Sequence, residues 1–94
     1  MALAFEWDSH KAARNVHKHG VSFNEAASVF GDPVAVTFYD PDHSVNEYRF
    51  ITIGLSNRAK ILVIAHTDRE SRIRIISARK ATSTERDYYE EAKN

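Results

Sequence analysis

Several arginine, glutamate and histidine residues in the second half of the sequence have side chains that could act together on a phosphodiester. Glu47 and Arg49 lie on one predicted strand, and His66 ends the next. Cleaving RNA needs no metal ion, because the 2′-hydroxyl already lies beside the phosphate. An arginine can bind the phosphate through two hydrogen bonds and oppose its growing negative charge. A histidine or a carboxylate can move the protons.

Arg79 is the first candidate for phosphate binding. Extending the alternation of the last predicted strand places Arg79 just past the strand end, where its side chain can reach a cleft. Lys80 follows and makes the local potential positive. We expect Arg79 and Arg49 to hold the phosphate, and His66 or Glu47 to move protons. The alternative is that Arg79 is an arginine at a helix entry or at an interface.

The other candidates have structural interpretations too. Glu47 and Arg49 could form a surface pair, and His66 could be a half-buried, hydrogen-bonded histidine. Tyr88 and Tyr89 could pack the final helix on the sheet or stack on a base.

The charge distribution is asymmetric although the net charge is zero. Residues 1–47 hold three Lys/Arg and seven Asp/Glu, whereas residues 48–94 hold ten and six. The window 49–80 has eight Lys/Arg against two acidic residues. Such a basic half permits binding to RNA, although solvated strand faces or a helix end could carry the same charges. The RNA-binding candidates are Lys18, Arg69, Arg72, Arg74 and Lys80.

The sequence offers little for a metal ion or a cofactor. It has no cysteine, so thiolate ligands, disulfides and cysteine nucleophiles are excluded. On a helix, His17 and His19 would face about 200° apart, and His10 lies two turns from His17. Three scattered glycines form no phosphate loop. We therefore expect no metal and no cofactor.

The length, composition and N-terminus predict a single soluble domain over residues 1–94. Hydrophobic residues make up 43% of the chain and charged residues 28%, as in ordinary globular proteins. No apolar run approaches the roughly 18 residues of a membrane span, and the N-terminus has no secretory pattern. A cytoplasmic location is expected.

The elements that must position these residues can be read from capping and periodicity. Residues 9–19 predict a helix that starts at Asp8 and stops at Gly20. A capping box at 22–25 opens a second helix with an apolar face through Phe30. A third helix follows another capping box at 82–85 and runs to about residue 92.

Between the second and third helices, four segments predict strands. They cover 34–39, 47–53, 61–66 and 72–77, with turns at 40–44, 56–60 and 67–71, and residues 5–7 could add an edge strand. The short connections favour hairpins. The expected fold is α+β, with two N-terminal helices on a mainly antiparallel sheet of four or five strands and a short C-terminal helix.

The order of motifs resembles the BrnT family of bacterial toxins along almost the whole chain. The resemblance is carried by the runs at 5–8, 18–23, 42–44, 66–69 and 72–81. The K-H-G-V-S-F run at 18–23 and the R-I-I-S-A-R run at 74–79 are the most specific.

This resemblance implies a type II toxin–antitoxin module with a RelE/ParE-like fold. It implies a ribonuclease that arrests growth and is neutralised by a BrnA-like, DNA-binding antitoxin in a hetero-oligomer. The superfamily supplies no shared catalytic set. Two alternatives therefore stay open at this point: a toxin of the same fold with another target such as DNA gyrase, and a non-catalytic partner-binding module.

Overall fold

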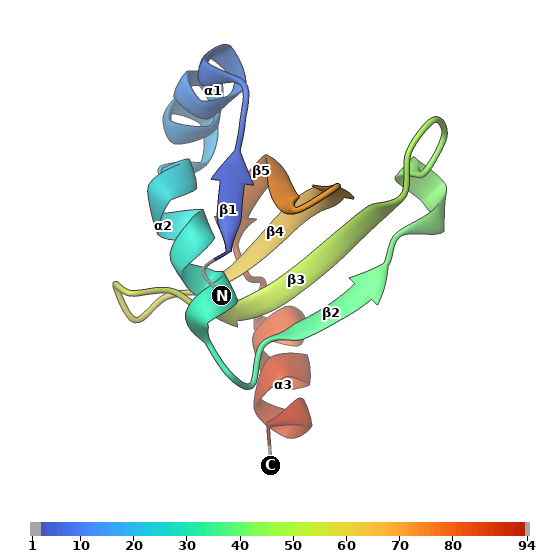
Figure 1. Ribbon diagram of the computed structural model, residues 1–94. Coiled ribbons are helices and arrows are strands. Elements are labelled where there is room, and N and C mark those ends of the chain that lie inside the picture. The colour runs from blue at the N-terminus through green and yellow to red at the C-terminus, as the bar shows by residue number, and fades with distance from the viewer. Residues whose placement is uncertain (1–2, 94) are drawn as a thin grey trace.

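The computed structural model describes residues 3–93 and places helices against both faces of one five-stranded sheet (Figure 1). The elements in chain order are β1 (Ala4–Glu6), α1 (Ser9–His19), α2 (Phe23–Ser28), the 3₁₀ turn η1 (Val29–Gly31), β2 (Val36–Tyr39), the 3₁₀ turn η2 (Pro41–His43), β3 (Arg49–Leu55), β4 (Ile61–Arg69), β5 (Arg72–Lys80) and α3 (Ser83–Ala92).

The strands lie in the order β1-β5-β4-β3-β2. Strands β2 to β5 form an antiparallel meander, and β1 pairs in parallel with the start of β5. The predicted α+β class and the mainly antiparallel sheet are confirmed. The edge strand suggested at 5–7 is present one residue earlier, at Ala4–Glu6.

The turn predicted at 67–71 is wrong, and the difference matters for the site. Strands β4 and β5 continue to Arg69 and from Arg72, so the turn consists of Glu70 and Ser71 alone. Glu70 adopts a left-handed conformation with φ of 58°, which a two-residue hairpin requires. Glutamate is not a residue that signals such a turn. Thr67 therefore lies inside a strand.

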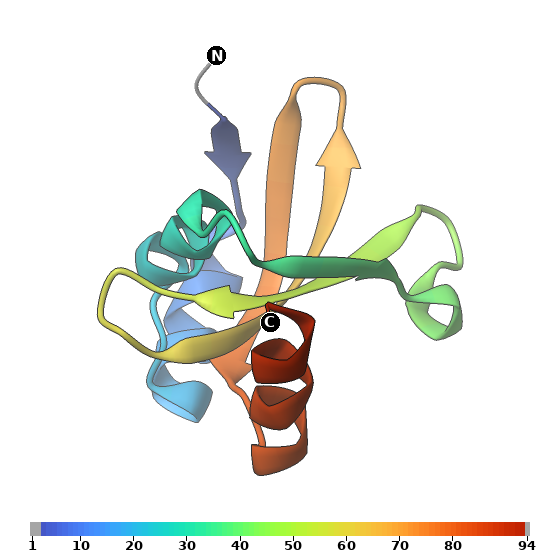
Figure 2. The same ribbon diagram turned by 90° about the horizontal axis from the view of Figure 1, so that it is seen from below.

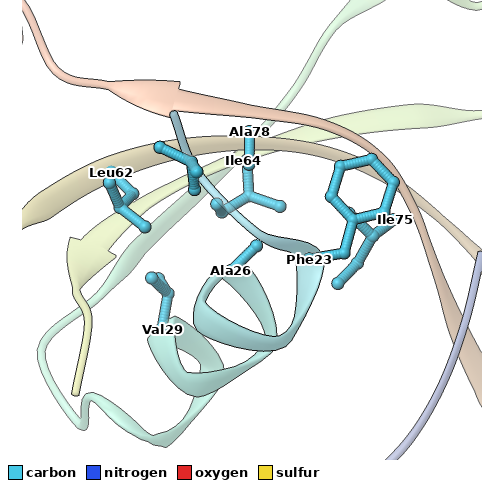
Figure 3. Packing of buried hydrophobic residues seen from close by; sticks show 8 residues of the cluster. Phe23, Ala26, Val29, Leu62, Ile64, Ile75 and Ala78 are labelled. Atoms are coloured by element: carbon cyan, nitrogen blue, oxygen red, sulfur yellow. The ribbon is translucent and has the colours of Figure 1, made fainter. Parts of the chain in front are cut away.

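The larger core lies between the sheet and α2 (Figure 3), and Ala12 of α1 packs against it. Ser22 begins α2, because its hydroxyl accepts a hydrogen bond from the Glu25 backbone N–H at 3.0 Å. The reciprocal half of the predicted capping box is absent, since the Glu25 carboxylate instead accepts a hydrogen bond from the Ser56 hydroxyl at 2.7 Å. The buried side chains of this core are Val21, Phe23, Ala26, Val29, Leu62, Ile64, Ile75 and Ala78.

Asn15 ties α1 to the sheet where β1 no longer covers β5. Its amide donates to the backbone carbonyls of Val21 and Ala78, and its oxygen accepts from the Ala78 N–H. Asn15 thus satisfies both backbone groups of Ala78 as a neighbouring strand would.

The smaller core lies on the opposite face, under α3. It comprises Ile53, Val63, Ala81 and Tyr89. Tyr89 donates a hydrogen bond from its hydroxyl to Asp32 at 2.6 Å. Burial and this hydrogen bond raise the pKa of Tyr89 to about 12, so the phenol keeps its proton and the link at neutral pH. Figure 2 shows the molecule from the side on which α3 lies, with α3 in front of the sheet.

Candidate active site

The strand register brings five arginines to one face of the sheet. Arg49 pairs with Thr67, and Thr67 pairs with Arg74, so the three side chains project from the same face. Alternation along the strands adds Arg69 and Arg72, and the pairing of Arg79 with Val63, across a register shift in β5, brings Arg79 to this face as well. We call it the arginine face, and its members are Arg49, Arg69, Arg72, Arg74 and Arg79. It lies opposite the face that α1 and α2 cover.

The centre of the arginine face has hydrogen-bonding capacity that the protein leaves unused. The Nε of Arg49 and the Oγ1 of Thr67 are buried and have no partner among residues 3–93. Within the same described range, Arg74 forms no ion pair. Guanidinium groups with spare donors bind phosphate oxygens well. The arrangement is therefore suited to an anion that bridges strands β3 and β5.

Glu47 lies beside this centre, in the loop before β3 and not on the strand as predicted. One of its carboxylate oxygens is 3.8 Å from the Nε of Arg49, and its side chain is 43% exposed. A carboxylate at this position can accept a proton from a bound substrate. Of the two predicted proton-transfer groups, Glu47 is the one that the structure places next to Arg49.

The turn end of the arginine face is partly neutralised by β1. Glu6 lies 3.8 Å from Arg69 and 3.9 Å from Arg72. Both arginine side chains are more than half exposed, and such exposed pairs are weak. These two arginines can still contact a polyanion that passes along this end of the sheet.

Arg79 does not lie past the end of its strand, because β5 continues to Lys80. Its guanidinium donates two hydrogen bonds to Glu85 of α3, at 2.7 and 2.8 Å. These bonds hold the pKa of Glu85 at about 2. Arg79 pairs with Val63 on β4, and Val63 pairs with Ile53 on β3. Ile53 is four residues from Arg49, so Arg79 lies level with a point about 13 Å along β3 from Arg49. The structure thus directs Arg79 to Glu85 and does not bring it together with Arg49 as expected.

His66 projects from the opposite face, so the expected meeting with the arginines does not occur. Its ring packs against Phe30 and Phe50, and its Nε2 lies 2.7 Å from the Thr52 hydroxyl. Burial lowers the pKa of His66, which keeps the ring neutral. The expected hydrogen bond is present at Nε2, but the residue is 3% exposed and so fully buried, and its Nδ1 has no hydrogen-bond partner among residues 3–93.

Two predicted RNA-binding lysines also lie away from the arginine face. Lys18 is exposed in the last turn of α1, a helix that covers the other face. Lys80 pairs with Leu62 and so has the opposite parity to Arg79. Thr67 and Glu6 are neighbours of the arginines that the sequence did not reveal.

Within 3–93, no group of three or more histidine, aspartate or glutamate side chains could hold a metal ion. No helix in that range is long and apolar enough to cross a membrane.

Comparisons with known proteins bear on the family and on the fold. The model of the family described as "Ribonuclease toxin, BrnT, of type II toxin-antitoxin system" matches residues 7–85. Among solved structures, the 1.1 Å crystal structure of the Brucella abortus ribonuclease toxin BrnT is similar to this chain. Its TM-score is 0.67 and its identity 24%, over 87% of this chain and 100% of that chain. At this identity the likeness supports the fold. Comparison with curated proteins gives no match.

Proposed function

This chain belongs to the BrnT family of ribonuclease toxins of type II toxin–antitoxin systems, and we propose that its arginine face binds RNA and cleaves it without a metal ion. The family makes the chain an endoribonuclease and favours RNA over DNA gyrase as the target. The location of the reaction on the protein is our proposal.

The observation that carries the proposal is the position of Arg49 opposite Arg74, with an Nε that has no hydrogen-bond partner among residues 3–93. The strands β3 and β5 lie two strand spacings apart, or about 10 Å. Two long arginine side chains that start at this separation can converge on one phosphate above Thr67. The buried Nε of Arg49 has no hydrogen-bond partner among residues 3–93, and the Glu47 carboxylate lies 3.8 Å from it.

We propose the following chemistry at this phosphate. The 2′-oxygen attacks phosphorus as its proton passes to Glu47, and the bond from phosphorus to the 5′-oxygen breaks. The 5′-oxygen leaves with a proton from solvent. Arg49 and Arg74 oppose the charge that grows on the non-bridging oxygens. The products are a 2′,3′-cyclic phosphate and a 5′-hydroxyl. Arg69 and Arg72 contact the flanking backbone.

A cleavage assay tests the mechanism with a substrate change and not only with a variant. Purified protein is incubated with an RNA oligonucleotide, in which one 2′-hydroxyl at the mapped cleavage position is replaced by hydrogen, and EDTA is present or absent. We expect cleavage to stop at the deoxy position alone and to continue in EDTA. Cleavage at the deoxy position, or its loss in EDTA, would contradict the proposal.

A type II toxin has a cognate antitoxin, and we propose that here it is a BrnA-like protein that forms a hetero-oligomer with this chain in the cytoplasm. Neutralising a toxin requires tight binding, with a Kd of about 1 nM or below, equivalent to roughly −12 kcal/mol. Co-expression followed by pull-down and titration tests this. Failure of the co-encoded small protein to bind would contradict the proposal.

A further inference from the structure

An apolar groove opens on the arginine face where α3 meets β2 and β3. Its volume is about 390 Å³. Apolar side chains dominate the walls, and the first turn of α3 supplies the polar groups. The lining residues are Phe38, Ile53, Thr84, Glu85 and Tyr88.

Two aromatic rings in this groove are left accessible by the fold. Phe38 is 43% exposed and Tyr88 is 48% exposed. The ring centroids are 6.3 Å apart and the ring planes meet at 81°. In this geometry, a planar group that stacks on one ring meets the other ring at its edge. The groove thus offers a flat surface and a side wall at right angles to it.

The groove lies next to the proposed phosphate site. Phe38 pairs with Ile51, and Arg49 is two residues from Ile51 on the same face. Phe38 and Arg49 therefore occupy diagonal positions on neighbouring strands, and such positions are about 7–8 Å apart. At the other end of the groove, Arg79 holds Glu85 through two hydrogen bonds. These hydrogen bonds hold the Glu85 carboxylate in place, so the first turn of α3 forms a fixed wall of the groove.

We propose that this groove is a subsite for one nucleobase of the RNA, stacked on Phe38 or Tyr88 while the adjoining phosphate is held by Arg49. This inference rests on the proposed function and extends it to substrate recognition. The occupant is a base and not a protein side chain because the apolar walls adjoin Arg49, a cation whose Nε has no hydrogen-bond partner among residues 3–93. Single-stranded nucleic acids combine flat bases with a charged backbone, and sites for them combine aromatic rings with basic side chains.

The test uses single-stranded RNA oligonucleotides that span a mapped cleavage site, with one abasic residue at each position in turn. Phe38→Ala and Tyr88→Ala remove the rings, Tyr88→Phe keeps the ring, and Tyr48→Ala removes an exposed tyrosine that does not line the groove. The values of kcat and KM are measured for each enzyme with each oligonucleotide. Arg49→Ala is assayed in parallel.

We expect Phe38→Ala and Tyr88→Ala to raise KM roughly tenfold, equivalent to about 1.4 kcal/mol. Tyr88→Phe and Tyr48→Ala should behave as wild type. In the wild type, one abasic position should raise KM by a similar factor, and this position should have no further effect in the alanine variants.

Wild-type KM values in both alanine variants would overturn the groove proposal. It would also be overturned if these variants lost antitoxin affinity while their KM for RNA stayed unchanged, because the groove would then hold a protein segment. Failure of the proposed function has a different result, since Arg49→Ala would then cleave RNA at the wild-type rate whatever the groove variants do.

Discussion

The two faces of the sheet come from the same strands but differ in what their side chains do. On the face under α1 and α2, Leu62, Ile64 and Ile75 are buried against the helices. On the other face, α3 covers a smaller cluster. Beyond it lie Arg49, whose Nε has no hydrogen-bond partner among residues 3–93, and Arg74, which forms no ion pair in that range. Strand alternation thus separates the residues that stabilise the fold from those proposed to act on RNA.

The largest effect is expected on the helix-covered face. Phe23 is 2% exposed at the centre of the larger core. Phe23→Ala should lower the free energy of unfolding by about 3–5 kcal/mol, because it removes buried apolar surface and leaves a cavity. Urea denaturation measures this. A loss below about 1 kcal/mol would contradict the placement of the core.

The second-largest effect is expected for a substitution on the arginine face, and it concerns the rate of RNA cleavage. Arg49→Ala should slow RNA cleavage by about 10²–10³, the typical cost of losing one preorganised donor. The free energy of unfolding should change by no more than about 0.5 kcal/mol. Arg49→Lys should recover only part of the rate, because an ammonium cannot make two parallel hydrogen bonds. Unaltered single-turnover rates in Arg49→Ala would remove this residue from the site.

A smaller effect is expected where α3 joins the sheet. The pKa of Glu85 is about 2 in the folded chain, below its ordinary value of 4.5. The pair with Arg79 therefore stabilises fully above about pH 4.5 and is lost as the pH falls toward 2. At pH 7, Arg79→Ala should cost about 1 kcal/mol of unfolding free energy, because the pair is partly solvated.

The pH dependence of this difference distinguishes an ion pair from simple packing. The gap in unfolding free energy between wild type and Arg79→Ala should narrow between pH 5 and about pH 2.5. A gap that stays constant over this range would show that Arg79 stabilises α3 by packing alone.

The smallest effect is expected at His66, which is buried on the helix-covered face. Burial lowers the pKa of His66 below 6.5, so the unfolded chain binds a proton that the folded chain does not. Wild-type stability should therefore fall as the pH drops below about 6.5. His66→Gln should flatten this slope, and the exposed His17→Gln should leave it unchanged. Equal slopes in wild type and His66→Gln would contradict the buried, neutral ring.

The sequence predicted where helices and strands lie better than it predicted which face of the sheet each side chain occupies. The capping residues Asp8 and Thr82 lie at the starts of α1 and α3 as predicted, because caps act through neighbours in sequence. Residues 61–66 are apolar at both parities, so no alternation indicated which way His66 points. The pairing of β4 with β3 and β5 determines the face on which the His66 side chain lies.

The site was harder to predict for two local reasons. Glu70 takes a left-handed conformation that its residue type does not signal, so the tight turn at this residue was not predicted. Thr67 was therefore assigned to a turn and not to its position in β4 between Arg49 and Arg74. The register between β4 and β5 also shifts at Ala65 and His66. Partner positions beyond such an irregularity cannot be counted from the sequence.

A charge-matched comparison of the two sides tests the central proposal most directly. Arg49→Ala with Arg74→Ala removes two cations from the arginine face, and Arg14→Ala with Lys18→Ala removes two exposed cations from α1 on the other side. Single-turnover RNA cleavage is measured for both double variants. We predict that the first double variant loses at least about 10²-fold in rate while the second cleaves as wild type. Equal rates for the two double variants would contradict the location of the site on the arginine face.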